Sequence, residues 1–550
     1  MASTSNYQIG NYHETYRTFR LTAPEHFNWA YEVFDRWGRD PNKVAMVWLS
    51  HDGKTTKNIT YRYMGERSRR AANVLSGVGA RPGDSVFIML PRIPEWWEVV
   101  LGCIRGLFIS VPGTTQLTHK DLVYRMNAAG IKIAVTDADN YPKFEALRGE
   151  CPTLEKVVVV GGGKGLLDYE TLMAQASPSL PNPNNLSSEP LMVYFTSGTT
   201  GNPKMVLNTH ASYPVGHIIT GKFWLDNRPT DLHYTLSDTG WAQAAWTCLF
   251  APWNMGAALF VWDHRGRFDP LGTLQMFEKY PISTFMAPPT AYRMLILEDL
   301  NKIKPMALRH CVGAGEPVNP EVIDAWKEGL GHHVWEGYGQ TETVLCIALF
   351  PGMRYKPGSM GVAAPGFNMA VVDDKGNVLP HGEEGEVAIR HRPVRPVGLF
   401  EGYWKNPEAN ANCFRGDWYY TGDRATLDEE GYYSFVGRGD DVIKSSAYRI
   451  GPFEVESALI EHPAVAEAAV VGSPDKIRGQ IVKAFVVLKP GFAGSDTLAK
   501  ELQEHVQRTT APYKYPREVE FMAELPKTIS GKIRRNELRK LEITRKSKRD

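Results

Sequence analysis

The chain has few cysteines and no long apolar run. Its six cysteines are scattered over 550 residues and form no C-x-x-C pair, so a disulfide framework is not expected. No stretch reaches the roughly 20 apolar residues that a membrane-spanning helix needs. The N-terminus carries Glu14, Glu25 and Asp35 and resembles neither a signal peptide nor an acid-poor transit peptide. Together these absences predict a cytoplasmic protein without a membrane span.

Net charge is also nearly absent. Lys and Arg number 62 against 61 Asp and Glu, so no global field attracts nucleic acid, and no nucleic-acid partner is expected. The basic run at residues 532–550 is interpreted as a solvated helical face. Nothing in the sequence separates a monomer from a homodimer. There are no internal repeats and no low-complexity segments.

Short apolar runs alternate with longer amphipathic segments over several hundred residues. Strands are predicted at residues 85–90, 132–136, 156–160 and 258–262. This alternation is typical of a layered α/β fold. From about residue 369, short strands with close turns predict a small antiparallel β-barrel or sheet.

A domain boundary is predicted near residues 438–441. Downstream, residues 453–459 have a helical pattern, and residues 465–471 and 483–488 have strand patterns. We therefore expect an α/β chain with a large N-terminal domain (1–437), a hinge (438–441) and a small α+β C-terminal domain (442–550).

The most informative segment runs from Thr196 to Lys204 and reads T-S-G-T-T-G-N-P-K. Glycine lets a backbone approach a ligand closely, hydroxyls and free N–H groups donate to phosphate oxygens, and lysine adds positive charge. Asn202 and Pro203 separate the last glycine from the lysine, which excludes the P-loop. The segment predicts a phosphate cradle, and an exposed Ser/Thr-rich turn is the alternative. The cradle residues are Thr196, Ser197, Gly198, Thr199, Thr200, Gly201 and Lys204.

Four further clusters suit a nucleotide. An aromatic can stack on a base, a carboxylate can hold Mg²⁺ or a ribose diol, and a guanidinium or ammonium can bind phosphate. Three have a plainer alternative: a tight turn for the Gly337–Gln340 segment and for Asp423, and a surface charge for Lys532. The clusters are Gly315-Glu316-Pro317; Glu336-Gly337-Tyr338-Gly339-Gln340-Thr341-Glu342; Asp423 with Phe435 and Arg438; and Lys532.

The five clusters, in this order, resemble the motifs of the adenylate-forming enzymes, and most closely the medium-chain acyl-CoA synthetase branch. The resemblance implies ATP, Mg²⁺ and coenzyme A as cofactors. It gives Lys204, Thr341, Glu342 and Lys532 catalytic roles, with Glu342 as the magnesium ligand. Tyr338 becomes the adenine platform, Asp423 the ribose ligand, and Arg438 a further nucleotide contact.

The same resemblance implies two half-reactions. A carboxylate first attacks MgATP to give an acyl-adenylate, with Lys532 stabilising the developing charge. The small domain then turns about Asp440, and CoA thiol displaces AMP. By resemblance the CoA-binding residues are Ser446, Ala447, Tyr448, Arg449 and Arg478. Ala447 stands where the family usually has glycine. Its extra methyl group is expected either to be absorbed by a shift of the backbone or to slow the thiol step.

The acyl pocket is expected to be larger than that of acetyl-CoA synthetases. Those enzymes have tryptophan at the position of Gly339, valine at Ala314, and Val-Thr where Trp241 is followed by Ala242 and Gln243. At about 0.8 kcal/mol per buried CH₂, an acid of about four to eight carbons would be favoured over acetate. This predicts a medium-chain, branched or aromatic acid. The Gln243 amide either lines the pocket and selects a polar acid or points away.

The leading interpretation is therefore an ATP-dependent carboxylic acid–CoA ligase. One alternative is a stand-alone adenylation enzyme that passes the acyl group to a carrier protein, which free CoA turnover would distinguish. A second is a non-catalytic protein on the same fold, against which the complete set of charged motif residues argues.

Overall fold

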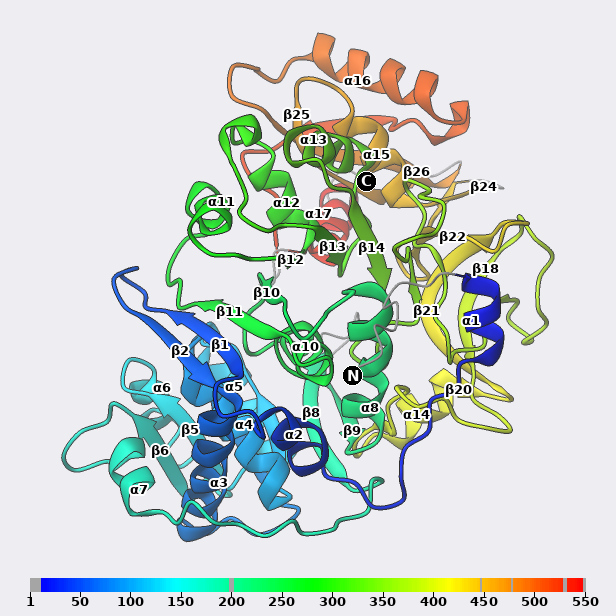
Figure 1. The fold of residues 1–550 in the computed structure, drawn as a ribbon. Coiled ribbons are helices and arrows are strands. Elements are labelled where there is room, and N and C mark those ends of the chain that lie inside the picture. Colours follow the sequence, from blue (N-terminus) through cyan, green and yellow to red (C-terminus); the bar gives the residue numbers. More distant parts are fainter. Residues whose placement is uncertain (1–10, 197–201, 446–447, 476–477, 528–531, 548–550) are drawn as a thin grey trace.

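The structure is a computed structural model of the chain, and it describes residues 11–196, 202–445, 448–475, 478–527 and 532–547. Among these residues it contains four β-sheets with helices packed against them. Figure 1 shows most of the blue and cyan N-terminal third at the bottom, with α1 apart from it beside the yellow strands. The green segments lie above, and the orange C-terminal part lies at the top. The α/β class predicted from the sequence is confirmed.

The first sheet has nine strands and is mostly parallel. Every residue of three central strands is buried, as expected of parallel strands that are covered on both faces. In spatial order, the nine strands are β16 (Val362–Ala363), β15 (Ile347–Ala348), β14 (Val334–Tyr338), β13 (His310–Ala314), β12 (Thr284–Ala287), β10 (Leu232–Thr235), β11 (Ala258–Trp262), β1 (Val44–Leu49) and β2 (Thr56–Thr60).

The second sheet has eight strands and contains three predicted strands. The predicted strand at 156–160 coincides with β6, and those at 85–90 and 132–136 coincide with β3 and β5 to within one residue. In spatial order they are β19 (Gly402–Tyr403), β9 (Lys204–Thr209), β8 (Pro190–Thr196), β4 (Ile109–Pro112), β3 (Ser85–Met89), β5 (Ile133–Asp137), β6 (Lys156–Val160) and β7 (Leu167–Asp168).

The third sheet lies where a small barrel or sheet was predicted. It is an antiparallel sheet of five strands, and a register shift between Glu386 and Ala388 bends its longest pairing. Its strands are β17 (Met369–Val372), β18 (Glu384–Arg390), β21 (Trp418–Leu427) and β20 (Phe414–Arg415), with β22 (Tyr433–Arg438) paired to β21.

The fourth sheet belongs to the C-terminal part of the chain. Its long antiparallel pair β25–β26 extends the two strands predicted there, and its core is separate from that of the large sheets. Its strands are β24 (Tyr448–Ile450), β23 (Ile443–Ser445), β26 (Gly479–Leu488) and β25 (Val465–Asp475), with β27 (Glu518–Phe521) parallel to β26.

Helices fill the connections between strands, as parallel sheets require. Several begin at side-chain caps; Thr118, for example, forms a capping box with Asp121 at the start of α5. The helices are α1 (Tyr12–Thr18), α2 (Asp35–Trp37), α3 (Tyr61–Gly77), α4 (Pro94–Gly106), α5 (His119–Ala129), α6 (Tyr141–Glu145), α7 (Tyr169–Gln175), α8 (Ser212–Ile219), α9 (Ala242–Ala245), α10 (Ala251–Asn254), α11 (Pro270–Lys279), α12 (Pro289–Leu295), α13 (Pro320–Leu330), α14 (Pro407–Cys413), α15 (Pro452–Ile460), α16 (Asp496–Thr509) and α17 (Arg535–Ser547).

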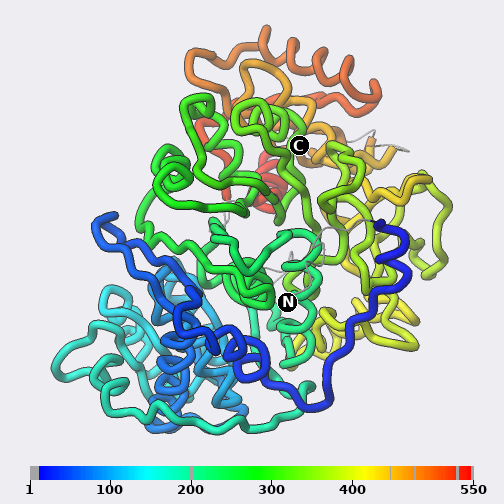
Figure 2. The backbone as a smooth tube through the Cα atoms, viewed as in Figure 1, coloured from blue at the N-terminus to red at the C-terminus, as the bar shows by residue number. Residues whose placement is uncertain are grey.

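The N-terminal segment connects distant parts of the large domain. In Figure 2 its blue tube starts beside the yellow strands, passes along the bottom of the molecule and returns toward the blue helices. Tyr12 donates its hydroxyl hydrogen to the carbonyl of Ala363 (2.8 Å), and Trp29 Nε1 donates to Asn254 Oδ1 (2.7 Å). The described part of this segment therefore packs on the large domain.

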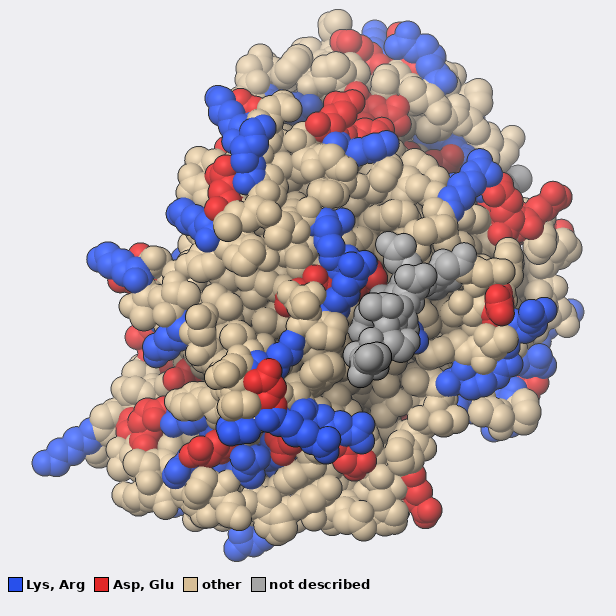
Figure 3. Space-filling view, in the orientation of Figure 1, with Lys and Arg blue, Asp and Glu red and all other residues tan. Residues whose placement is uncertain are grey.

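The charged side chains are mixed in sign. Figure 3 shows Lys and Arg interspersed with Asp and Glu over the face it draws, as the net charge of +1 leads one to expect. None of the helices in the described part of the chain is long and apolar enough to cross a membrane.

Candidate active site

The predicted nucleotide residues meet around one cavity of about 720 Å³. It lies at the carboxyl ends of β13 and β14, where parallel sheets place their ligands, and the C-terminal part of the chain closes it. The predicted residues that line it are Thr196, Lys204, Gly315, Glu316, Pro317, Glu336, Gly337, Tyr338, Gly339, Gln340, Thr341, Glu342, Asp423, Phe435, Arg438 and Lys532. Ser197, Gly198, Thr199, Thr200 and Gly201 lie outside the described residues.

Tyr338 and Asp423 are tied together within this cavity. The Tyr338 hydroxyl donates to Asp423 Oδ2 (2.7 Å), and Gln340 Nε2 donates to the same oxygen (2.6 Å). Arg438 Nε lies 4.0 Å from the other carboxylate oxygen, Asp423 Oδ1. Tyr338, the predicted adenine platform, and Asp423, the predicted ribose ligand, therefore belong to one hydrogen-bonded unit.

Glu336 places a buried carboxyl group in the cavity wall. Its Oε1 accepts a hydrogen bond from the backbone N–H of Val318 (2.7 Å), and its Oε2 has no hydrogen-bond partner. Burial raises the pKa of this carboxyl to about 8, and the bond from Val318 offsets only part of that shift. Glu336 is therefore protonated over much of the neutral range and can donate a hydrogen bond.

Tyr403 connects the first cradle to Glu342, and the sequence analysis missed it. Its hydroxyl donates to Glu342 Oε1 (2.7 Å), while Lys204 Nζ lies over its ring, 4.7 Å from the centroid. Burial raises the pKa of Glu342, opposed by the Tyr403 bond and by the charges of Arg438 and Lys204. The only sequence signal was an aromatic residue on a short segment, β19, far from the motifs; pairing of β19 with β9 brings it to the cradle.

The site fits a magnesium ion that arrives with a nucleotide. No group of three or more His, Cys, Asp or Glu side chains in the described part of the chain could hold a metal alone. Mg²⁺ is commonly bound by one or two carboxylates together with substrate phosphates. The buried carboxylate of Glu342, facing the cavity beside Lys204, suits that role.

Lys532 reaches the cavity from the C-terminal part of the chain. A Cβ atom built on Gly315 would lie 3.7 Å from Lys532 Cε and 3.9 Å from Nζ. Gly315 has a φ of +103°, a left-handed conformation that favours glycine. The motifs around positions 196 and 532, far apart in sequence, thus face the same space.

Most of the predicted acyl residues do not line this cavity. Of Trp241, Ala242, Gln243, Ala314 and Gly339, only Gly339 lines the cavity. The Gln243 amide donates to the sulfur of Met286 (3.4 Å), so it is engaged by β12.

The space beside Gly339 is not empty. A Cβ atom at this position would lie 2.5 Å from the edge of the Trp246 indole and 2.5 Å from the carbonyl oxygen of Val344. The expectation that glycine here frees room for several methylenes is thus corrected: a tryptophan from another segment takes part of that room.

The predicted CoA residues that the structure describes, Tyr448, Arg449 and Arg478, do not line the cavity. Tyr448 and Arg449 are exposed on β24, where the Tyr448 ring stacks on Tyr513 with centroids 4.2 Å apart. The bridge between Ser445 and Gly479 brings this hairpin next to the Arg478 backbone. Ser446 and Ala447 lie outside the described residues. Asp440 follows β22, and its carboxylate lies 3.6 Å from Arg438 Nε.

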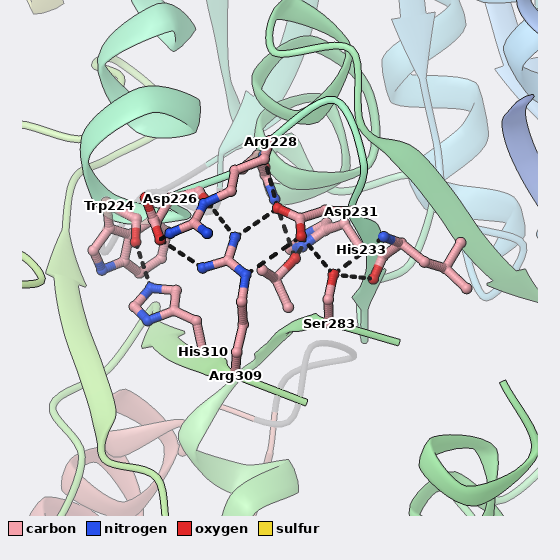
Figure 4. Close-up of polar contacts among 11 residues, drawn as sticks. Trp224, Asp226, Arg228, Asp231, His233, Ser283, Arg309 and His310 are labelled. Atoms are coloured by element: carbon pink, nitrogen blue, oxygen red, sulfur yellow. Dashed lines mark hydrogen bonds and ion pairs between the residues drawn. The ribbon is translucent and has the colours of Figure 1, made fainter. Parts of the chain in front are cut away.

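A buried ion network lies next to the start of β13. Figure 4 shows Arg309 between Asp226 and Asp231, with Nη–Oδ distances of 2.5 Å and 2.6 Å. Next along the chain, His310 Nε2 donates to the Trp224 carbonyl (2.7 Å). The Trp224 ring packs against Gly337, where a Cβ would lie 2.6 Å from it. The network and His310 therefore fix the position of Trp224, against which Gly337 packs.

Comparison with known proteins defines the class. The family model described as AMP-binding enzyme matches residues 33–404, and the one described as AMP-binding enzyme C-terminal domain matches residues 454–532. The chain belongs to the AMP-binding enzyme family, which confirms the predicted resemblance to adenylate-forming enzymes.

Particular relatives are similar over nearly their whole length. Acyl-coenzyme A synthetase ACSM3, mitochondrial, of Rattus norvegicus is 47% identical over 98% of this chain and 94% of its own. The anthranilate CoA ligase AuaEII, solved with anthranoyl-AMP, has a TM-score of 0.87 at 31% identity and covers 94% of this chain and 98% of its own. A benzoate CoA ligase from Burkholderia xenovorans has a TM-score of 0.81 at 26% identity, covering 93% and 100%.

Proposed function

We propose that this chain is an AMP-forming acyl-CoA synthetase that converts a carboxylic acid, ATP and coenzyme A into an acyl-CoA thioester, AMP and pyrophosphate. The observation that carries the proposal is the approach of Lys532 to Gly315 in the cavity that also holds Lys204 and Glu342. The names of the relatives, acyl-coenzyme A synthetase and CoA ligase, support the same reaction.

In the first half-reaction the acid's carboxylate oxygen attacks the α-phosphorus, and the bond to pyrophosphate breaks. Lys532 places its positive charge where negative charge develops, which is most effective in a site that excludes water. Lys204 and the 196–201 cradle hold the outer phosphates. Glu342 would hold Mg²⁺, which would supply positive charge to neutralise the phosphates. Asp423, fixed by Tyr338, receives the ribose hydroxyls.

The second half-reaction requires another arrangement of the C-terminal domain. We take residues 1–437 as the large domain, 438–441 as the hinge and 442–550 as the small domain, turning about Asp440. β22 ends at Arg438 and β23 begins at Ile443, which supports this division. The turn withdraws Lys532 and brings Tyr448, Arg449 and Arg478 to the site, where the thiol displaces AMP.

The acid is of medium chain length or aromatic. The anthranilate and benzoate ligases, similar over nearly their whole length, support an acid larger than acetate. A cytoplasmic location stays a prediction, because the ACSM3 relative is named mitochondrial; fractionation of cells that express the native chain decides it.

The test is AMP formation from ATP, Mg²⁺ and acids from acetate to octanoate, with benzoate and branched acids, each with and without CoA. Turnover that depends on CoA and is highest with an acid larger than propionate supports the proposal. Pyrophosphate release unaffected by CoA favours transfer to a carrier protein instead. No acid-dependent turnover with any member of the panel would overturn both.

A further inference from the structure

Asn319 occupies the N-cap position of α13 without capping the helix. Asparagine is favoured at this position because its side-chain oxygen accepts a hydrogen bond from a backbone N–H of the first turn. Asn11 and Asn406 form such bonds at the starts of α1 and α14. Asn319 has the extended backbone of an N-cap residue and only 2% of its surface is exposed, yet its side chain makes no cap bond. Its amide group is engaged elsewhere.

The Asn319 amide connects the proposed large domain to the proposed small domain. Its Nδ2 donates to the hydroxyl oxygen of Ser457 on α15 (3.1 Å). Its Oδ1 accepts from Nη1 of Arg293 on α12 (3.5 Å). Asn319 also lines the cavity. One side chain thus forms a hydrogen bond across the domain interface, beside the site.

On the large-domain side, this contact leads to the loop that faces Lys532. Arg293 Nη2 lies 3.6 Å from Glu316 Oε2, and both residues line the cavity. Glu316 directly follows Gly315, the residue that the Lys532 side chain approaches. Arg293 therefore links Asn319 to the wall of the cavity opposite Lys532.

On the small-domain side, α15 is fixed to the segment that carries Lys532. Glu456, next to Ser457, accepts hydrogen bonds from Arg535 Nε (2.9 Å) and Nη2 (2.6 Å), and its side chain is 5% exposed. A two-point pair of arginine and carboxylate defines the relative orientation of its partners. Arg535 comes three residues after Lys532. The position of α15 therefore determines where Lys532 lies.

We propose that Asn319 is a positioning residue for the first half-reaction: its bond to Ser457 holds the small domain in the orientation in which Lys532 reaches the nucleotide. The inference rests on the proposed function, because it concerns the alternation of the two half-reactions. The bond breaks when the small domain turns, since Asn319 stays with the large domain and Ser457 moves. It therefore stabilises only one of the two orientations.

The consequence is measurable as a change in the ratio of the two half-reaction rates. Each orientation of the small domain supports one half-reaction, so this ratio follows the populations of the two orientations. A neutral hydrogen bond changes such an equilibrium about fivefold, equivalent to about 1 kcal/mol. Asn319→Ala and Ser457→Ala each remove the bond, so each lowers the ratio of the adenylation rate to the thiol-step rate about fivefold.

The experiment measures both half-reactions of the full chain with the acid that gives the highest turnover. ATP–pyrophosphate exchange reports adenylation, and conversion of supplied acyl-adenylate and CoA reports the thiol step. Asn319→Ala, Ser457→Ala and the double variant are compared with Asn11→Ala and Ser495→Ala. The two controls each remove a helix-cap bond, one in each proposed domain, at positions that do not line the cavity.

Thermal unfolding of each variant reports whether it is folded. Ser457 is only partly buried, so Ser457→Ala carries the test even where the buried position of Asn319 does not accept alanine. A purely structural role would lower both half-reactions together and leave their ratio unchanged.

In the expected result, the ratio falls about fivefold in each single variant, and the double variant falls no further than about twofold beyond either, because the same bond is removed only once. KM for the acid and the ratios of both controls stay at wild-type values. Folded single variants whose ratio stays within about twofold of wild type overturn the inference, as does a double variant that shows the product of the two single effects. Absence of acid-dependent exchange in the wild type overturns the proposed function instead, so the two failures are distinct.

Discussion

The Tyr403 hydroxyl donates a hydrogen bond to Glu342 at 2.7 Å while the ring of the same tyrosine lies under Lys204. One side chain thus fixes the expected magnesium ligand and the cradle lysine relative to each other. Tyr403 lies on β19, the edge strand that joins the second sheet by pairing with β9.

Replacing that hydroxyl should weaken magnesium dependence specifically. Tyr403→Phe keeps the ring beneath Lys204 and leaves Glu342 without its bond, which costs about 1–3 kcal/mol for a charged acceptor. We expect the Mg²⁺ concentration for half-maximal rate to rise about tenfold or more, with a small change in KM for the acid. Titration of Mg²⁺ at saturating ATP measures it, and an unchanged Mg²⁺ curve would show that Tyr403 does not position Glu342.

The buried carboxyl of Glu336 makes stability depend on pH in a defined direction. Its pKa is about 8 when folded and near 4.5 when exposed, so the folded chain binds the extra proton between these values. Stability from this group is present at pH 4.5 and is lost as pH rises toward 8. The full loss is on the order of a few kcal/mol.

Glu336→Gln removes this dependence and keeps a neutral group of the same shape. The thermal midpoint of the variant should rise relative to wild type by several degrees as pH is raised from 5 to 8. Scanning calorimetry without nucleotide at matched pH values tests it. A constant difference between the two proteins across that range contradicts a raised pKa at Glu336.

The network around Arg309 should be costly to break. Arg309→Ala leaves Asp226 and Asp231, each at most 5% exposed, as buried charges without their main partner. We expect a loss of about 3–5 kcal/mol in stability. Arg354→Ala, which breaks an exposed pair with Glu430, is the control and should cost under about 1 kcal/mol. Equal midpoints for the two variants in urea would count against the network's structural role.

Much of the fold followed from local patterns, and the reason is visible in particular strands. The 156–160 and 258–262 runs are strands with the predicted ends, because they are rich in valine and aromatic residues, which favour strands. The motif residues could also be recognised in the sequence, because glycines, hydroxyl groups and charged side chains differ from the apolar strands that precede them. Tyr403 and Trp246 were missed because an aromatic residue looks the same in a core and in a site.

What placed those two residues was long-range packing. Trp246 and Gly339 lie almost a hundred positions apart, and neither segment's sequence predicts contact with the other. Reading Gly339 alone suggested open space, whereas its neighbour in the fold fills it. The size of one side chain indicates free space in a pocket only when the residues that surround it in the fold are known.

The measurement that tests the account most directly separates the two half-reactions in Lys532→Ala. Lys527→Ala is the matched control, because Lys527 lies five residues away, is not among the residues that line the cavity, and has its ammonium 2.7 Å from the Glu467 carboxylate. Acyl-adenylate formation is followed by ATP–pyrophosphate exchange, and the thiol step by conversion of supplied acyl-adenylate and CoA. The account predicts that Lys532→Ala loses about 10²–10³-fold in exchange and keeps the thiol step, while Lys527→Ala keeps both. Undiminished exchange in Lys532→Ala would contradict it.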